Sequence, residues 1–188
     1  MGMPQTEQRW TADNVRALPD DGNRYECVDG ELLVTPAPRF AHQRAVRDLA
    51  RRLHSYLDKH SFGEMLFSPA DIEFDPHTLV QPDIFVFPIE TGRRIESWRD
   101  IGHLLLAVEV LSPSSARADR MVKRRAYQRS GVPEYWVVDL DARLVERWRP
   151  GDERPEVLSE TLEWTPLPAV SARLDLPTLF ARVLGPPA

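Results

Sequence analysis

Blocks of apolar and polar positions along the chain predict an α/β fold with a mixed sheet flanked by helices. Short β-branched or aromatic runs bounded by turn residues predict strands, and apolar residues spaced three or four apart predict helices. The predicted strands cover residues 24–28, 31–35, 63–74, 79–87, 104–111, 134–140 and 144–149. The predicted helices cover residues 11–18, 41–59, about 114–130 and 177–184. A hairpin, a helix, three strands, a helix and further strands in this order indicate a mixed sheet.

Turn residues mark the boundaries of these elements. Asp29-Gly30 predicts a two-residue hairpin, and residues 75–77 predict a second hairpin connection. Ser114 or Ser115 is expected to cap the helix that follows the strand at 104–111. Residues 91–103 are charged and predict irregular structure with one helical turn near Ser97. We expect one domain over residues 1–188, with a core at about 10–150 and a β-rich extension at 151–188.

The most unusual polar position is Glu109, which interrupts the apolar run at 104–111, "LLLAVEVL". A short apolar run that ends at Ser112-Pro113 predicts a buried central strand. An ionised carboxylate there costs several kcal/mol unless it is paired or binds a metal. Glu109 is therefore a candidate functional residue.

A second acid, Asp83, lies within the apolar segment "LVQPDIFVFP". Two carboxylates on neighbouring buried strands suggest a shared metal site. The alternative is that each acid caps a loop or pairs with one of the many arginines. That alternative is the simpler one for Asp83 alone, whereas the two acids together favour a site.

Composition limits the classes of protein to consider. The net charge of −5 argues against a coat that binds nucleic acid indiscriminately. The single Cys27 excludes an internal disulfide and a cysteine-based zinc site, and it fits the cytoplasm. No segment approaches the ~20 apolar residues of a membrane helix, so no membrane partner is expected.

Basic residues are nevertheless concentrated between residues 116 and 130, where six cations face the single Asp119. Such a stripe suits a phosphate-bearing partner, with Arg117, Arg120 and Arg124 as candidate nucleic-acid contacts. It is equally typical of a solvated helix face. Lys123 is one of only two lysines among the 24 basic residues, so it is a candidate for chemistry that arginine performs poorly. Its alternative role is a helical ion pair with Asp119.

A known family shares this order of motifs. "RYECVDGELLVTPAP" followed by His42, then "QPDIFVF", "VEVLSPSS" and the segment from Asp119 to "GVPEYWVVD", resemble the Uma-two family of proposed endonucleases. The resemblance covers roughly residues 10–140. It implies the PD-(D/E)xK restriction-endonuclease-like superfamily and Mg²⁺-dependent cleavage of nucleic-acid phosphodiester bonds, with DNA expected as the substrate and Mn²⁺ as a substitute metal.

The same resemblance implies roles for individual residues. Asp83 and Glu109 would hold the metal, and Lys123 would serve as a migrated substitute for the superfamily lysine, whose position holds Leu111. Glu31 and His42 are supporting candidates, each with an ordinary surface role as the alternative, and Asp119 is a third. Cutting both strands of a duplex would be simplest with a homodimer.

A different class of function is also consistent with the sequence. Because Leu111 departs from the superfamily pattern, the protein could keep the fold without cleaving and act as a nucleic-acid-binding or assembly module. A divalent ion at Asp83 and Glu109 would favour the enzyme. A buried arginine that neutralises both acids would favour the non-catalytic protein.

Overall fold

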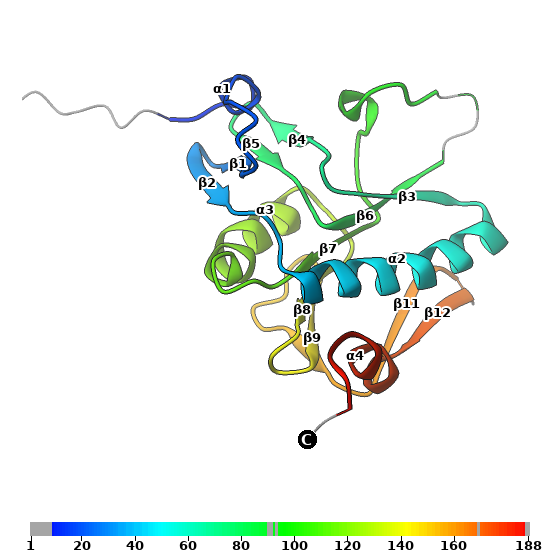
Figure 1. Ribbon diagram of the computed structural model, residues 1–188. Coiled ribbons are helices and arrows are strands. Elements are labelled where there is room, and N and C mark those ends of the chain that lie inside the picture. The colour runs from blue at the N-terminus through cyan, green and yellow to red at the C-terminus, as the bar shows by residue number, and fades with distance from the viewer. Residues whose placement is uncertain (1–8, 90–91, 93, 169, 187–188) are drawn as a thin grey trace, which may run out of the picture.

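A computed structural model describes residues 9–89, 92, 94–168 and 170–186 (Figure 1). The helical segments are α1 (Ala12–Arg16), α2 (Phe40–His60), η1 (Trp98–Asp100), η2 (Ala118–Lys123), α3 (Arg124–Arg129) and α4 (Leu176–Leu184). The first six strands are β1 (Arg24–Val28), β2 (Glu31–Thr35), β3 (Gly63–Phe67), β4 (Ile72–Asp75), β5 (Thr78–Val80) and β6 (Ile84–Pro88). The other six are β7 (Leu106–Val110), β8 (Tyr135–Asp139), β9 (Leu144–Trp148), β10 (Glu156–Leu158), β11 (Thr161–Leu167) and β12 (Val170–Asp175).

The central sheet has six strands in the order β10-β9-β8-β7-β6-β3. Only β7 and β8 pair in parallel, and the helix that connects them supplies the crossover that a parallel pair requires. A four-stranded antiparallel sheet, β2-β1-β5-β4, and the hairpin β11-β12 complete the fold. The predicted α/β class with a mixed, helix-flanked sheet is confirmed.

The predicted hairpin turns are confirmed, whereas two of the predicted strands are too long. β1 and β2 have the predicted bounds, and Asp29 and Gly30 both have positive φ, as a two-residue turn of this kind requires. The predicted strands at 63–74 and 79–87, however, are each two strands that belong to different sheets. Pro69 and Pro82 lie at the two breaks, where proline cannot donate a ladder hydrogen bond.

The central sheet separates two apolar cores. One core packs even-numbered residues of β6 and β7, such as Val86 and Val108, against α2, α4 and the β11-β12 hairpin. The other packs odd-numbered residues, such as Phe85 and Ala107, against the small sheet and α3. The segment from 151 onward therefore contributes to the first core, through residues such as Trp164 and Phe180.

The helix after β7 differs from the prediction at its start and in its winding. Ser112, rather than Ser114 or Ser115, caps it: its Oγ accepts from the Ser115 backbone N–H, and Ser115 Oγ accepts from the Ser112 N–H. The stretch η2 is π-helical, with the Arg124 N–H donating to the Asp119 carbonyl. π-Helical stretches are rare in proteins overall, and those that do occur are often found at functional sites. The predicted turn near Ser97 is present as η1. Among the described residues, no helix is long and apolar enough to cross a membrane.

Candidate functional site

The structure brings Asp83 and Glu109 together on one face of the central sheet. β6 and β7 are antiparallel with Ile84 opposite Val108, so one further step of that register sets Asp83 opposite Glu109. Residues opposite each other in an antiparallel pair point to the same face, with Cβ atoms about 5 Å apart. The Val110 N–H donates to Asp83 Oδ2 at 2.8 Å, which holds the Asp83 carboxylate against the end of β7.

Asp83 has a cation and a histidine as neighbours. Arg24 from β1 donates to its Oδ1 at 2.8 Å, and His42 Nε2 from the first turn of α2 lies 2.9 Å from its Oδ2. Burial by itself would raise the pKa of Asp83, but the His42 hydrogen bond and the Arg24 charge outweigh it and lower this pKa to about 2. An ionised carboxylate only accepts hydrogen bonds, so Nε2 of His42 carries the proton.

Glu109 has a different environment. It is buried, and its Oε1 accepts from Lys123 Nζ at 3.1 Å and from Tyr127 Oη at 3.1 Å. Burial raises the pKa of Glu109 well above its usual value, and Lys123 offsets only part of that rise. Because both hydrogen bonds end at Oε1, Oε2 is the oxygen that is left to bind a cation.

Lys123 lies in a pocket of carboxylates. Its ammonium is 2.7 Å from Glu26 Oε2 and 3.3 Å from Asp119 Oδ1, in addition to Glu109, and its side chain is only 1% exposed. Burial would lower the pKa of Lys123, but the three carboxylates together raise it above the usual value. The ammonium thus sits beside Glu109, with Glu26 and Asp119 as its other two carboxylate neighbours. The predicted helical ion pair between Lys123 and Asp119 is present, but both side chains are buried and Lys123 contacts two further carboxylates.

Glu26 is a site residue that the sequence analysis missed. It is fully buried in β1, where its Oε1 also accepts from the Gln81 N–H at 2.7 Å. A signal was present in the sequence: Glu26 interrupts an otherwise strand-like run, two residues after Arg24 and so on the same face. Arg24 and Tyr127 are two further residues of the site that were not among the predicted site residues.

The formal charges of this cluster leave room for a divalent cation. Four carboxylates (Glu26, Asp83, Glu109, Asp119) face two cations (Arg24 and Lys123), which leaves two negative charges in a buried region. Asp119 is completely buried, and its carboxylate contacts Lys123 at 3.3 Å and accepts a hydrogen bond from the Ser115 side chain. Carboxylate oxygens are the ligands that Mg²⁺ prefers, and Mg²⁺ usually keeps several waters beside one or two of them. The donor set therefore fits Mg²⁺, although no group of three or more His, Cys, Asp or Glu in the described part of the chain is arranged as a ready metal cage.

Arg24 bears directly on the choice between enzyme and binding module. It pairs with Asp83, and the nearby Glu109 and Asp83 carboxylates outweigh its burial and raise its pKa. Glu109 instead has Lys123 as its ion-pair partner. Arg24 therefore acts electrostatically on both acids, as expected of the non-catalytic protein, but Glu109 has a second cation, Lys123, in direct contact.

A cavity of about 830 Å³ gives access to one side of this cluster. Its lining includes Arg24, His42 and Asp83, together with the loops at 35–39 and 112–115. Glu109 and Lys123 lie behind this lining, in the protein interior. His42 is itself buried, so its expected alternative role at the surface is wrong.

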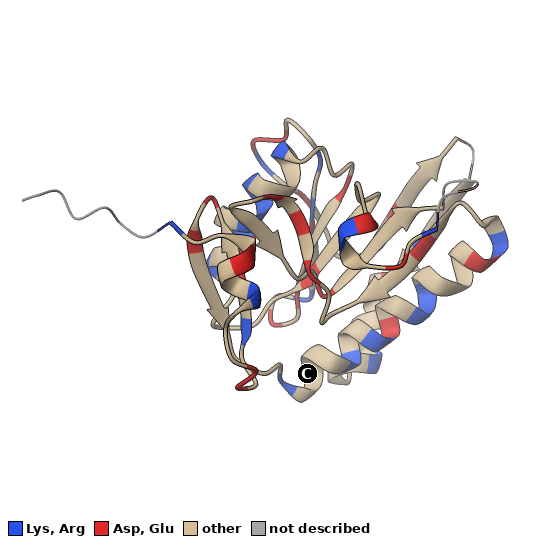
Figure 2. Ribbon diagram, turned by 90° about the horizontal axis from the view of Figure 1, so that it is seen from above, with Lys and Arg blue, Asp and Glu red and all other residues tan. Residues whose placement is uncertain are grey.

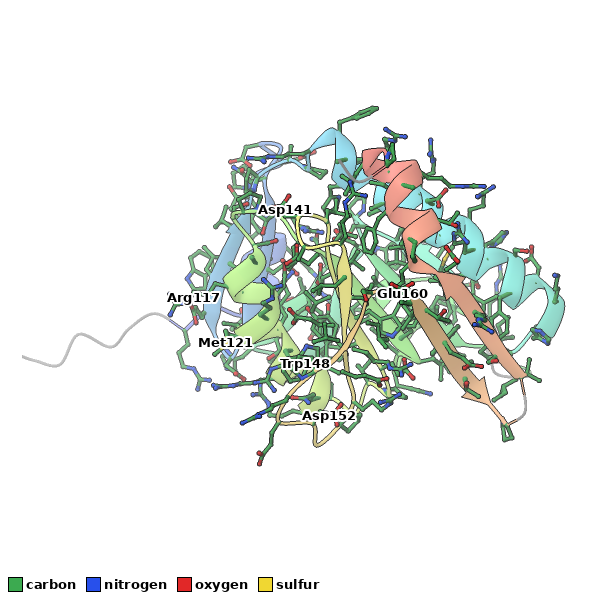
Figure 3. All side chains as sticks on the ribbon, turned by 90° about the horizontal axis from the view of Figure 1, so that it is seen from below. Arg117, Met121, Asp141, Trp148, Asp152 and Glu160 are labelled. Carbon is green, nitrogen blue, oxygen red and sulfur yellow. The ribbon has the colours of Figure 1, made fainter. Side chains whose placement is uncertain are left out.

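The remaining predicted site residues lie elsewhere. Glu31 is exposed at the turn end of β2. The carboxylate that the β1-β2 hairpin contributes to the site is instead the buried Glu26. Arg120 is bound by Asp139 and Glu146, each at 2.7 Å, and Arg124 lies over the Trp148 ring at 4.5 Å. These two arginines have structural partners on β8 and β9. Arg117 is exposed, and Figure 3 shows it with Met121 at the periphery of the molecule.

Comparison with known proteins shows the family and the fold of this chain. Residues 12–178 match the model of the Uma2 (Uma-two) family, which is described as "Putative restriction endonuclease". Because the match spans most of the chain, this protein belongs to that family. A crystal structure from Anabaena variabilis, described as a putative nuclease belonging to DUF820, is similar with a TM-score of 0.74 and 22% identity, over 93% of this chain and 99% of that one. At that identity the likeness shows the fold. No curated protein matched.

Proposed function

We propose that this protein is a Mg²⁺-dependent endonuclease that hydrolyses phosphodiester bonds in DNA. The observation that carries the proposal is the cross-strand pair of Asp83, which lines the cavity, and Glu109, which lies behind it, within a buried cluster whose formal charges leave two negative charges in excess. Membership of the Uma2 family supports the class of reaction. A Mg²⁺ ion held by Asp83 and by Glu109 Oε2 would polarise the scissile phosphate and its attacking water.

The chain's own residues have distinct tasks in this proposal. Lys123 stays protonated among its three carboxylates, so it supplies positive charge to Glu109 and does not take a proton from water. Tyr127 stays protonated as well, because burial raises its pKa well above the usual value, and it donates to Glu109. Arg24 and His42 orient Asp83 at the cavity wall, where Arg24 can also face a phosphate oxygen.

Supercoiled plasmid tests this proposal when it is incubated with the protein over a series of Mg²⁺ and Mn²⁺ concentrations. We expect metal-dependent nicking by the wild type and a loss of about 10²-fold or more in Glu109→Gln. Glu134→Gln is a matched control, because burial also raises the pKa of Glu134 but its partners are Arg147 and Arg149. The control should cleave like the wild type.

The alternative is a non-catalytic protein that binds nucleic acid, and the engagement of Asp83 by both Arg24 and His42 is the observation in its favour. This alternative predicts that the wild type binds the plasmid and slows its migration in a gel-shift assay. It also predicts that the plasmid is not nicked at any concentration of Mg²⁺ or Mn²⁺. Action as a homodimer stays a prediction in both cases.

A further inference from the structure

Five arginines gather where α2 packs against α4, outside the carboxylate site. Four come from α2 and one from α4: Arg44, Arg47, Arg51, Arg52 and Arg182. Figure 2 shows basic residues repeated along the length of α2. We call this set the α2–α4 arginine cluster.

A single buried carboxylate organises this cluster. Asp48, with a side chain only 5% exposed, lies 3.5 Å from Arg51, 3.4 Å from Arg52 and 4.0 Å from Arg182. One negative charge therefore holds three guanidinium groups in place without neutralising them. The side chains of Arg51 and Arg182 remain 62% and 53% exposed.

The other two members add charge that is not balanced nearby. Arg47 is exposed and makes no ion pair with any described residue, and Arg44 donates to the Arg182 carbonyl. Asp175 lies near both Arg52 and Arg173, so these two neighbours of the cluster add one charge of each sign. The cluster thus keeps a local excess of positive charge in a chain whose net charge is −5. In the basic segment at 116–130, by contrast, Arg120 is neutralised by two carboxylates and Lys123 by three.

The cluster leads toward the proposed site. His42, which contacts Asp83, lies only two residues before Arg44 on the same helix. From His42 to Arg51 the helix rises about 14 Å, a distance that several nucleotides of a bound strand would cover. Phe40 begins the helix with its ring 79% exposed and with the Arg44 guanidinium 5.8 Å from the ring centroid. An exposed aromatic ring beside arginines is a surface on which a nucleotide base can stack.

We propose that the α2–α4 arginine cluster binds the sugar-phosphate backbone of the DNA and guides it along α2 toward the cavity at Asp83. The inference rests on the proposed function, because it takes DNA as the substrate. Backbone contacts of this kind position the nucleic acid without reading its sequence. Binding should therefore depend strongly on salt and weakly on sequence.

The test compares two triple variants with the same change in net charge. The cluster variant is Arg47→Gln, Arg51→Gln and Arg182→Gln. The control is Arg94→Gln, Arg99→Gln and Arg129→Gln, three exposed arginines that each have an acidic partner outside the cluster. Binding of a fluorescent 30-base-pair duplex is measured by fluorescence anisotropy over a series of salt concentrations. EDTA is present throughout, because it removes divalent metal and so prevents metal-dependent cleavage.

The association constant K for the duplex should depend less steeply on salt concentration in the cluster variant. We expect the slope of log K against log salt concentration to decrease in magnitude by about 0.9 for each phosphate that the variant no longer neutralises. The decrease should be about 2 to 3 in the cluster variant and small in the control. Arg47→Gln alone breaks no ion pair with a described residue and should lower the slope by about 0.9. This single variant tests the inference even if the triple variant loses its fold. Equal slopes for cluster variant and control, or no duplex binding by the wild type, would overturn the inference.

Hydrolysis of the small diester bis(p-nitrophenyl) phosphate separates this inference from the proposed function. It needs the carboxylate site but no extended backbone track, so the cluster variant should hydrolyse it like the wild type in Mg²⁺. If the wild type hydrolyses it and the cluster variant still binds duplex like the control, only the inference fails. If neither diester nor plasmid is cleaved but duplex binding depends on the cluster, only the proposed function fails.

Discussion

The ammonium of Lys123 lies 3.1 Å from Oε1 of Glu109, and both side chains are about 1% exposed. The contact joins the central strand β7 to the π-helical turn η2 across 14 residues of sequence. It places a full positive charge in the interior beside the carboxylate that would otherwise be hardest to keep ionised. Glu26 and Asp119 surround the same ammonium, so the lysine is as much a part of the fold as of the site.

Removal of the Lys123 charge should destabilise the protein strongly. Lys123→Met leaves three carboxylates buried without their cation, and we expect a loss of about 3–5 kcal/mol in the free energy of unfolding at neutral pH. Urea denaturation measures it.

A second substitution shows whether that loss comes from charge. Lys123→Met combined with Glu26→Gln should recover part of the stability, because one of the three unpaired acids is gone. A loss below about 1 kcal/mol in Lys123→Met would mean that the carboxylates are already protonated in the folded protein.

Glu109 should make the protein less stable as pH rises. Since burial raises its pKa above 4.5, the folded state keeps a proton that the unfolded state releases above that pH. The free energy of unfolding in EDTA should therefore fall as pH rises from about 4.5 toward the folded pKa. In Glu109→Gln the fall should be smaller, though not absent, because burial raises the pKa of Asp119 too.

Mg²⁺ should reverse this trend in the wild type alone. A cation that binds only the folded state raises its stability, and the increase should disappear in Glu109→Gln. Thermal melting with and without Mg²⁺ at neutral pH measures both effects. Equal stabilisation of the two proteins would remove Glu109 from the proposed metal site.

Asp83 should act in the opposite direction on the acid side. Its pKa is lowered from 3.8 to about 2, so its contribution to stability is present above about pH 3.8 and is lost as pH falls toward 2. The loss should amount to about 2 kcal/mol. His42→Asn removes one of the interactions that lower this pKa and should make the acid-side loss shallower. His54→Asn, whose partner Asp58 is 64% exposed, should leave the profile unchanged.

Substitution of Arg120 and of Arg117 should have different effects on stability, because Arg120 is held in ion pairs and Arg117 is exposed. Arg120→Gln breaks two partly buried ion pairs and should cost about 1 kcal/mol of stability, while the salt slope of duplex binding stays at the wild-type value. Arg117→Gln should leave stability unchanged, because the side chain is exposed. A reduced salt slope in Arg120→Gln would restore the role in nucleic-acid binding that its sequence suggested.

Local patterns were enough to determine much of the fold. The β1-β2 hairpin follows from Asp29-Gly30 between two alternating runs, because only residues that tolerate positive φ can form that turn. The buried strand β7 follows from its short apolar run, and Glu109 is conspicuous there because a carboxylate is costly in such a place. The bounds of β3 to β6 did not follow, since a strand can change sheets at a proline without any change in its apolar pattern.

Only the tertiary structure decided which charges meet. The register of β6 on β7 joins Asp83 to Glu109, and the packing of β1 and η2 adds Glu26 and Lys123 from distant parts of the chain. The arginines show the same division: Arg120, in the densest basic segment of the sequence, pairs with acids on β8 and β9, whereas arginines of α2 and α4 share one buried Asp48. Sequence patterns report the periodicity of a single element, but ion pairs depend on distances between elements, which arise only when the cores have formed.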